Sequence, residues 1–407
     1  MTTATTTPTR LPVAVPVLAL GIFCLGTSEF MLAGLLPEMA RELGVSIPAA
    51  GSLISAFAIG MLVGAPVMAL LTLRLPRKVT LVGAGVVFAL AHLAGALTTS
   101  FGLLVTTRVV AAVACATFWA VASVTVVAVT PKNLTARGLG TLISGITLAN
   151  IVGVPAGTWV SDHWGWESTF VAVAALSVAA TVAVALLVPE TASDEKIAIG
   201  ALARRELQGL TGSRLWLAVG TTVAVQSTMV ATFSYLSPLL TDVSGLSAGV
   251  VPLVLLAFGL GSFAGITVGG RFADRDPLLN VVVSLLATIV SLAVVWLAAP
   301  SAVAIVPAVV VWGFATFTVA SAINARIFQH GDQAPNLVAG VNVAAFNIGN
   351  AIGPWAGGLV ITAGLGYRAL LPLSISLALV GLLVAAASWR VERGRTVEVE
   401  AAPCPAC

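Results

Sequence analysis

Long apolar runs alternate along the chain with short stretches that hold most of its polar and turn-forming residues. An α-helix of about 20 apolar residues crosses the hydrocarbon core of a bilayer. The runs lack the strict apolar–polar alternation of membrane β-strands, so helices are predicted. Twelve membrane-spanning helices are expected, over residues 12–35, 49–72, 79–98, 102–129, 135–160, 167–188, 215–237, 248–270, 279–298, 301–324, 335–363 and 369–389.

The longest polar interruption, residues 190–214, divides the predicted helices into two sets of six. We therefore expect an N-terminal six-helix bundle over residues 12–189 and a C-terminal six-helix bundle over 215–390. Residues 190–214 form a cytoplasmic linker in this scheme, with cytoplasmic tails at 1–11 and 391–407.

The distribution of basic residues predicts the orientation of these helices. Short cytoplasmic loops of membrane proteins are enriched in Lys and Arg. With the N-terminus in the cytoplasm, 16 of the 19 basic residues fall on the cytoplasmic side; Arg41 and Arg368 fall outside, and Arg108 lies within a span. An odd number of spans would mix the two sides, so both termini are predicted to be cytoplasmic.

The two halves share landmarks at a nearly constant distance along the chain. Asn150 and Gly153 return as Asn350 and Gly353, 200 positions later. Because each half has an even number of spans, the halves have the same orientation, as in parallel repeats related by an axis along the membrane normal. The sequence thus predicts an all-α membrane protein built from two parallel six-helix pseudo-repeats.

Small residues recur at every fourth position on four predicted helices, two in each half. Such rows let helix backbones approach closely in lipid. Two interpretations stay open: ordinary helix packing, or a seam on which the two halves rock. The rows are Ser52, Ala56, Gly60 and Gly64; Ala257, Gly261, Gly265 and Gly269; Gly145, Ala149, Gly153 and Gly157; and Ala345, Gly349, Gly353 and Gly357.

Composition excludes several classes of protein. Hydrophobic residues make up 58% of the chain and charged residues 9%, against about 25% charged in soluble domains, which indicates an integral membrane protein. No basic face suited to nucleic acid is present. The chain also lacks a phosphate-binding G-x-x-x-x-G-K-[ST] loop, a nucleophile–base pair and a cluster of metal ligands, so neither an ATP-driven pump nor an enzyme is expected, and no cofactor.

Two charged residues lie in the middle of predicted spans, Glu29 and Arg108, and neither has a counterpart in the second half. A charge at that depth costs about 2.5–3.5 kcal/mol on insertion scales, so it is rarely retained without a function. A carboxyl group in low-dielectric surroundings holds its proton to higher pH than in water. Glu29 is therefore a candidate for proton coupling, with a purely structural hydrogen-bonded acid as the alternative. Arg108 is either its partner or a tie to backbone carbonyls.

Several stretches of the chain resemble sequence motifs of the twelve-span drug:proton antiporter branch of the major facilitator superfamily. The stretch from Gly145 to Gly157 is similar to the antiporter motif of that branch, and Gly349 to Gly358 matches it more closely. Arg108 occupies the place of the arginine in the motif on the fourth span. The stretch from Gly269 to Pro277 resembles the family's gate motif; its first copy departs at Leu73, where aspartate is usual.

Other segments resemble actinobacterial chloramphenicol-resistance exporters, in particular Gly26 to Pro37, Arg205 to Leu207 and Thr232 to Leu236. This resemblance implies a proton-coupled antiporter of the cell membrane that exports chloramphenicol or a similar small amphipathic drug by alternating access. Its expected partners are the drug, protons and membrane lipid, and we expect a monomer. A sugar, nucleoside or other metabolite exporter is the alternative in the same class. A channel is less favoured because no filter sequence or ring of charges occurs.

The predicted functional residues form three groups. Proton coupling is assigned to Glu29 and Arg108. Substrate binding is assigned to polar and aromatic residues on helices expected to line the cavity: Asn150, Gln226, Phe233, Tyr235, Asn324, Asn342, Phe346 and Asn347. Conformational motifs comprise Arg74, Arg77, Lys78, Gly153, Pro155, Gly157, Asp274, Arg275, Gly353, Pro354 and Gly357. His92, on the third predicted span, is interpreted as a packing residue rather than a proton relay.

Overall fold

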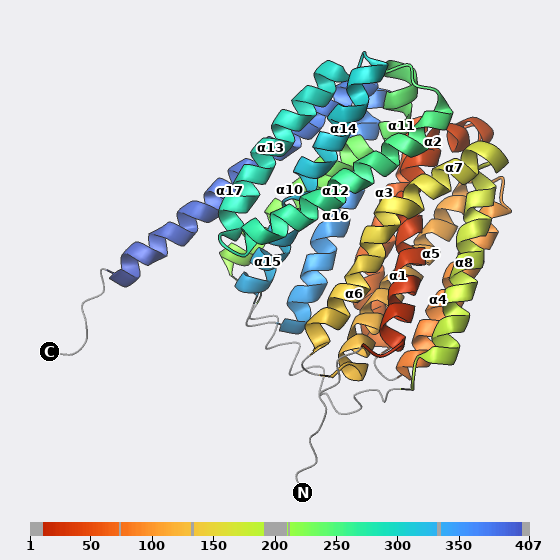
Figure 1. Cartoon of the computed structure of the whole chain (residues 1–407), viewed down its shortest axis with the longest axis horizontal. Helices are drawn as coiled ribbons and strands as arrows, with labels where there is room; N and C mark the ends of the chain where they lie inside the picture. The colour runs from red at the N-terminus through yellow and green to blue at the C-terminus, as the bar shows by residue number, and fades with distance from the viewer. Residues whose placement is uncertain are drawn as a thin grey trace, which may run out of the picture. The chain divides into compact units, whose positions relative to one another are not determined.

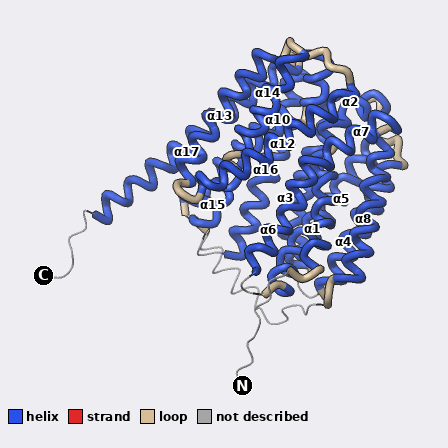
Figure 2. Tube along the Cα trace, in the orientation of Figure 1, coloured by secondary structure: helices blue, strands red, loops and turns tan. Residues whose placement is uncertain are grey.

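The computed structural model describes residues 11–72, 75–131, 134–190, 210, 212–331 and 335–400. Within these ranges the regular elements are helices, joined by short turns, and no strand occurs (Figures 1 and 2). The predicted all-α membrane fold is confirmed. Ten of the described helices are long and apolar enough to cross a membrane, or eleven if one bent pair counts as a single span.

The described residues fall into two compact units. The first lies within Met1–Ile197 and also takes in Ala248–Leu256, and the second lies within Ala198–Ser247 and Ala257–Cys407. The boundary after residue 197 falls inside the predicted linker, most of which is outside the described ranges.

The first six predicted spans correspond to the helices of the N-terminal unit, coloured from red to yellow-green in Figure 1. These elements are α1 (Ala14–Phe30), α2 (Leu32–Glu42), α3 (Ile47–Leu71), α4 (Arg77–Ala96), α5 (Phe101–Val129), α6 (Thr135–Leu148), the π-helical turn η2 (Ala149–Gly153), α7 (Val154–Trp164) and α8 (Trp166–Leu187).

The second half of the chain forms the remaining elements. They are α10 (Ser213–Phe233), α11 (Leu236–Pro238), η3 (Leu239–Val243), η4 (Ala248–Val250), α12 (Val251–Ala273), α13 (Pro277–Ala298), α14 (Ala302–Phe317), α15 (Ala320–His330), α16 (Pro335–Thr362), η5 (Tyr367–Ala369) and α17 (Leu370–Glu400).

Each predicted span lies on one or more of these helices. Several of them differ from the prediction in shape or in where they end. The first is bent by 49° where α1 meets α2. The tenth was expected to end at residue 324, whereas α15 continues to His330. The last was expected to end at 389, whereas α17 continues to Glu400.

Helix α16 (Pro335–Thr362) coincides with the predicted span 335–363. Its 28 residues are ample for a crossing, since a helix rises about 1.5 Å per residue. Its sequence contains four asparagines and five glycines. Polar side chains on a spanning helix are costly in lipid and mark a functional element.

The two small-residue rows on α6–η2–α7 and on α16 have the same role in their respective units. A Cβ at Gly145 would collide with the carbonyl oxygen of Ala19 on α1, and one at Gly153 with the side chain of Thr27. In the second unit, a Cβ at Gly349 would lie 2.5 Å from the Cβ of Gln226 on α10. Each glycine row therefore lets one helix lie against the first helix of its own unit.

The rows on α3 and α12 are also packed within their units. Gly60 and Gly64 lie against α5, and Gly261 and Gly265 lie against α14. These contacts agree with the interpretation of the rows as packing surfaces. A role of the same rows in rocking stays a prediction.

Candidate functional site

The last turn of α1 carries the residues around which the candidate site of the N-terminal unit is built. Ser28 and Glu29 are both buried there, two and one residues before the helix ends at Phe30. The hydroxyl of Thr27 donates to the carbonyl of Phe23 at 2.8 Å, a back-bond that often accompanies helix bending. The bend into α2 follows directly, so the glutamate sits where the first span changes direction.

Arg108 extends from α5 to this turn and is only 1% exposed. Its Nη1 donates to the Ser28 hydroxyl at 2.6 Å and its Nη2 donates to the Ser28 carbonyl at 2.9 Å. The guanidinium carbon also lies 4.3 Å from the centroid of the Phe57 ring on α3. Two hydrogen bonds and a cation–π contact offset part of the cost of burying this charge.

Glu29 and Arg108 interact electrostatically, and the buried thiol of Cys115 on α5 lies near both. The structure thus brings the two predicted proton-coupling residues into one cluster. It adds Ser28, which sequence reasoning missed because a serine in an apolar span is usually satisfied by its own helix.

His92, on α4, belongs to the same cluster. Its Nε2 lies 2.6 Å from the hydroxyl of Ser28, and its Nδ1 lies 2.9 Å from the carbonyl oxygen of Phe88. The imidazole packs between the rings of Phe88 and Phe170, at centroid distances of 4.2 and 5.5 Å. The predicted packing role is therefore correct but incomplete, because the ring also has a polar partner on α1.

Asn150, a predicted substrate-binding residue, lies in the π-helical turn between α6 and α7. Its side-chain amide donates to the carbonyl of Ile146 on its own helix at 3.2 Å. Pro155 and Gly157 follow in the first turns of α7. Single π-turns inside α-helices are frequent at functional sites, and this one lies in the segment that packs against α1.

In the second unit, several predicted residues are partners of one another or hold α16 in place. Gln226 on α10 donates to the amide oxygen of Asn350 at 2.6 Å, and the hydroxyl of Tyr235 donates to the carbonyl of Pro354 at 2.7 Å. Asn342 donates to the side chain of Asn324 at 2.7 Å. These bonds tie α16, which carries Gly353 and Gly357, to α10 and α15.

Three further predicted residues occupy the interior of that unit. The ring of Phe233 lies 5.0 Å from that of Phe258 on α12, and Phe346 packs against a hydrophobic cluster. Asn347 donates to the carbonyl of Val343 at 2.9 Å. In the part of the chain that the structure describes, the buried amide oxygens of Asn342 and Asn347 have no hydrogen-bond donor, so they could accept one from a ligand.

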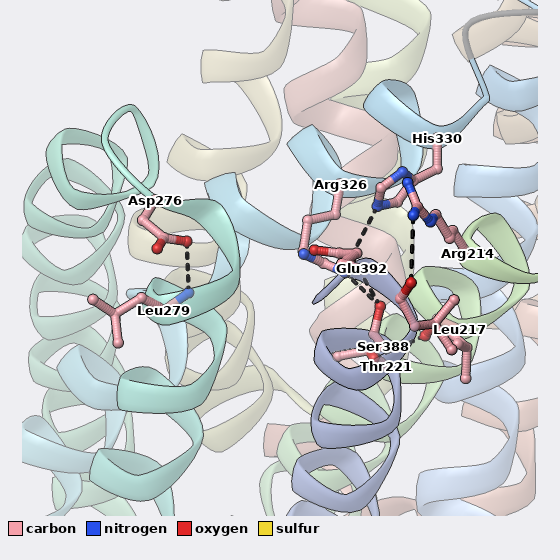
Figure 3. Close-up of polar contacts among 10 residues, drawn as sticks. Arg214, Leu217, Thr221, Asp276, Leu279, Arg326, His330, Ser388 and Glu392 are labelled. Atoms are coloured by element: carbon pink, nitrogen blue, oxygen red, sulfur yellow. Dashed lines mark hydrogen bonds and ion pairs between the residues drawn. The ribbon is translucent and has the colours of Figure 1, made fainter. Parts of the chain in front are cut away.

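The gate motifs are placed only in part. Arg74 and Leu73 lie outside the described residues, and Arg77 and Lys78 begin α4. Asp274 and Arg275 form the turn between α12 and α13 and are exposed. The residue that follows, Asp276, was not predicted to have a role; its carboxylate accepts a hydrogen bond from the backbone N–H of Leu279 at 2.9 Å and caps α13 (Figure 3).

A second charged cluster, which sequence reasoning missed, joins α15 and α17 (Figure 3). Arg326 lies beyond residue 324, where the tenth span was expected to end, but is only 4% exposed. Its Nη2 donates to Oε1 of Glu392 at 2.6 Å and to the hydroxyl of Ser388 at 2.7 Å. The Nε2 atom of His330 lies 3.3 Å from the same carboxylate oxygen. This half-buried ion pair stabilises the part of α17 that continues past the predicted end of the last span.

Comparison with known proteins finds similar membrane transporters over nearly the whole chain. Residues 18–336 match the family model described as Major Facilitator Superfamily. A chloramphenicol resistance protein of Streptomyces lividans is 40% identical over 97% of this chain and 100% of its own length. The inner membrane transport protein YdhP of Escherichia coli K12 is 37% identical over 86% of this chain and 89% of its own.

Solved structures with the same fold have little sequence in common with this chain. The crystal structure of the nucleoside transporter NupG aligns with a TM-score of 0.73 at 15% identity, over 93% of this chain and 100% of that one. At this identity the likeness bears on the fold alone.

Proposed function

Because the chain belongs to the major facilitator superfamily, a family of membrane transporters, we propose that it exports chloramphenicol or a similar small amphipathic drug in exchange for protons. The proposal places the protein in the cell membrane with both termini in the cytoplasm. Export proceeds by alternating access, and the result for the cell is antibiotic resistance.

The similarity to the Streptomyces lividans chloramphenicol resistance protein carries the choice of substrate. It extends over 97% of this chain at 40% identity, so it includes both units and not merely the helical framework. The buried amide oxygens on α16 support the same choice, because the hydroxyl and amide groups of a phenicol are hydrogen-bond donors that such oxygens can accept.

The buried Glu29–Arg108 cluster supports proton coupling. A carboxyl group that is shielded from water and lies near a fixed positive charge can exist in both its neutral and its ionised form, so it can take up and release a proton. One proton moving down a potential of 100 mV supplies about 2.3 kcal/mol. That energy supports on the order of 50-fold expulsion of a neutral solute, since about 1.4 kcal/mol corresponds to a factor of ten.

A growth-inhibition panel tests the substrate. Cells of a drug-sensitive host would express the protein or an empty vector, and phenicols, nucleoside analogues, sugar analogues and cationic dyes would be compared. Protection confined to phenicols or strongest for them is the expected result. Protection against nucleoside or sugar analogues alone would contradict drug export and support the metabolite alternative.

The variant Glu29→Gln tests the coupling. Glutamine keeps the size and polarity of the side chain but cannot carry a proton. We expect the variant to reach the membrane in normal amounts and to lose uphill export, measured as drug accumulation in inverted vesicles with an imposed pH gradient. Undiminished uphill export by this variant would contradict a coupling role for Glu29.

A further inference from the structure

The hydrogen bonds around His92 determine which of its ring nitrogens carries the proton. The carbonyl oxygen of Phe88 can only accept, so Nδ1, 2.9 Å away, must be the N–H group. Nε2 is then an acceptor in the neutral ring. Its partner at 2.6 Å is the Ser28 hydroxyl, which must donate to it.

The same reasoning fixes the direction of the whole chain of bonds. The guanidinium of Arg108 is donor-only, and its Nη1 donates to the Ser28 oxygen at 2.6 Å. The Ser28 hydroxyl in turn donates a hydrogen bond to Nε2 of His92. The bonds thus run from Arg108 through Ser28 to His92 and end on the Phe88 carbonyl.

Protonation of His92 would reverse the bond to Ser28. Nε2–H would then donate to the second lone pair of the Ser28 oxygen, and the hydroxyl hydrogen of Ser28 would lose its acceptor on the ring. The new positive charge would lie between two phenylalanine rings and close to the charge on Arg108. The geometry favours a neutral acceptor over a proton carrier.

We propose that His92 is a positioning residue that acts through the Ser28 hydroxyl to hold the Arg108 guanidinium in its place beside Glu29. The proposal rests on the proposed proton coupling through Glu29. It adds that the response of Glu29 to pH depends on a histidine that itself does not titrate with transport.

The ionisable groups of the neighbouring helices are few. From α1 come Glu29 and the thiol of Cys24, which donates to the carbonyl of Leu176 on α8. From α5 come Arg108 and Cys115. Helix α8 faces the imidazole with the apolar ring of Phe170. A change in the pH response on altering His92 would therefore act through the Glu29–Arg108 pair.

Two substitutions separate the two hydrogen bonds of the ring. In His92→Gln, the amide oxygen can reach the position of Nε2 and accept from Ser28. In His92→Asn, the shorter amide reaches the position of Nδ1 and can donate to Phe88, but offers no acceptor to Ser28. The variant Ser28→Ala removes the hydroxyl that joins the histidine to the arginine.

The measured quantity is the pH at which half of the Glu29 carboxyl band is lost in infrared spectra of purified protein in nanodiscs, with Glu29→Gln identifying the band. In Ser28→Ala the guanidinium loses its bond to the hydroxyl, and in His92→Asn that hydroxyl is no longer oriented by the ring, so in both variants the guanidinium is freer to pair with Glu29. An opposite charge stabilises the ionised carboxylate, so this pH should fall by about one unit. In His92→Gln it should stay close to the wild-type value.

The results that would overturn the proposal are distinct. Equal values in the Asn, Gln and wild-type proteins would show that His92 does not position Arg108. If His92→Gln and His92→Asn lost proton-driven drug exchange in proteoliposomes to the same extent, the imidazole would itself carry the proton. The infrared titration requires no substrate, so a wild-type protein that fails to exchange drug for protons would contradict the proposed function without deciding the role of His92.

Discussion

At the scale of single residues, function is concentrated where a polar side chain is buried among apolar ones. Ser28 is fully buried and accepts from Arg108 through both its hydroxyl and its carbonyl oxygen. The two parallel donors of a guanidinium match this arrangement, whereas an ammonium group is a single point charge. The site therefore requires an arginine in particular, and not simply a positive charge.

The substitution Arg108→Lys should consequently be harmful despite keeping the charge. Loss of one charged hydrogen bond in a buried site costs about 1.5–3 kcal/mol, and misplacement of the charge beside Glu29 should reduce proton-driven export at least tenfold. The measurements are the thermal unfolding midpoint in detergent and drug transport in inverted vesicles. Arg41→Lys, at an exposed position on α2, is the matched control. Equal behaviour of the two variants would refute the role of the guanidinium geometry.

At the scale of helices, close approach of α6 to α1 positions the turn that carries Glu29. Gly145 lies against the backbone of Ala19, and Gly153 against Thr27, two residues before Glu29. The family's antiporter motif on this helix thus has a direct structural consequence, which is to fix the first span from one side. Gly349 and Gly353 do the same for α10 in the second unit.

Two glycines of α6 allow a matched test of this contact. A Cβ at Gly145 would collide with backbone, whereas a Cβ at Gly140 would meet nothing within 4 Å. Gly145→Ala should destabilise the protein by about 1–3 kcal/mol through overpacking and lower export. Gly140→Ala should be neutral or stabilising, since glycine costs up to about 1 kcal/mol relative to alanine inside a helix. Thermal unfolding in detergent measures both, and a similar loss in the two variants would contradict the assigned contact.

The extension of α17 provides a second test at this scale. Removal of Glu392 leaves Arg326 buried without its carboxylate, so Glu392→Ala should cost about 1–3 kcal/mol. The double variant Arg326→Met with Glu392→Leu replaces the pair by apolar side chains and should recover much of that loss. Unfolding midpoints of the single and double variants decide the matter. A double variant less stable than Glu392→Ala would mean that the ion pair is not the source of the effect.

At the scale of the whole molecule, the chain is a duplicated membrane protein in which the halves have diverged. Each unit has a glycine-rich helix packed against its first helix. The buried Glu29–Arg108 cluster belongs to the N-terminal unit, while the amide pairs of Gln226 with Asn350 and of Asn342 with Asn324 belong to the other. This division agrees with the proposal that one unit handles the proton and the other contributes polar groups to the substrate.

The predicted orientation in the membrane can be tested with two single cysteines. The buried Cys24 and Cys115 should not react with a membrane-impermeant maleimide, and Cys404 and Cys407 would be replaced by serine. We expect Arg41→Cys to be labelled in intact cells and Thr135→Cys to be labelled only after the membrane is opened. Labelling of both from the same side would overturn the twelve-span topology.

The sequence by itself determined the class of fold, the approximate spans, the duplication and the two intramembrane charges. It could do so because the cost of exposing polar groups to lipid leaves a strong local signal in every span. The boundaries were less predictable where tertiary contacts extend a helix, as Glu392 does by pairing with Arg326 of α15.

Only the tertiary structure decided which polar side chains meet. Ser28 and His92 are 64 positions apart, and Arg108 is 80 positions from Ser28. Nothing in their local sequence distinguishes a serine or histidine that satisfies its own helix from one that joins a buried network. The difference depends on how closely α1, α4 and α5 approach one another, which packing across the whole unit sets.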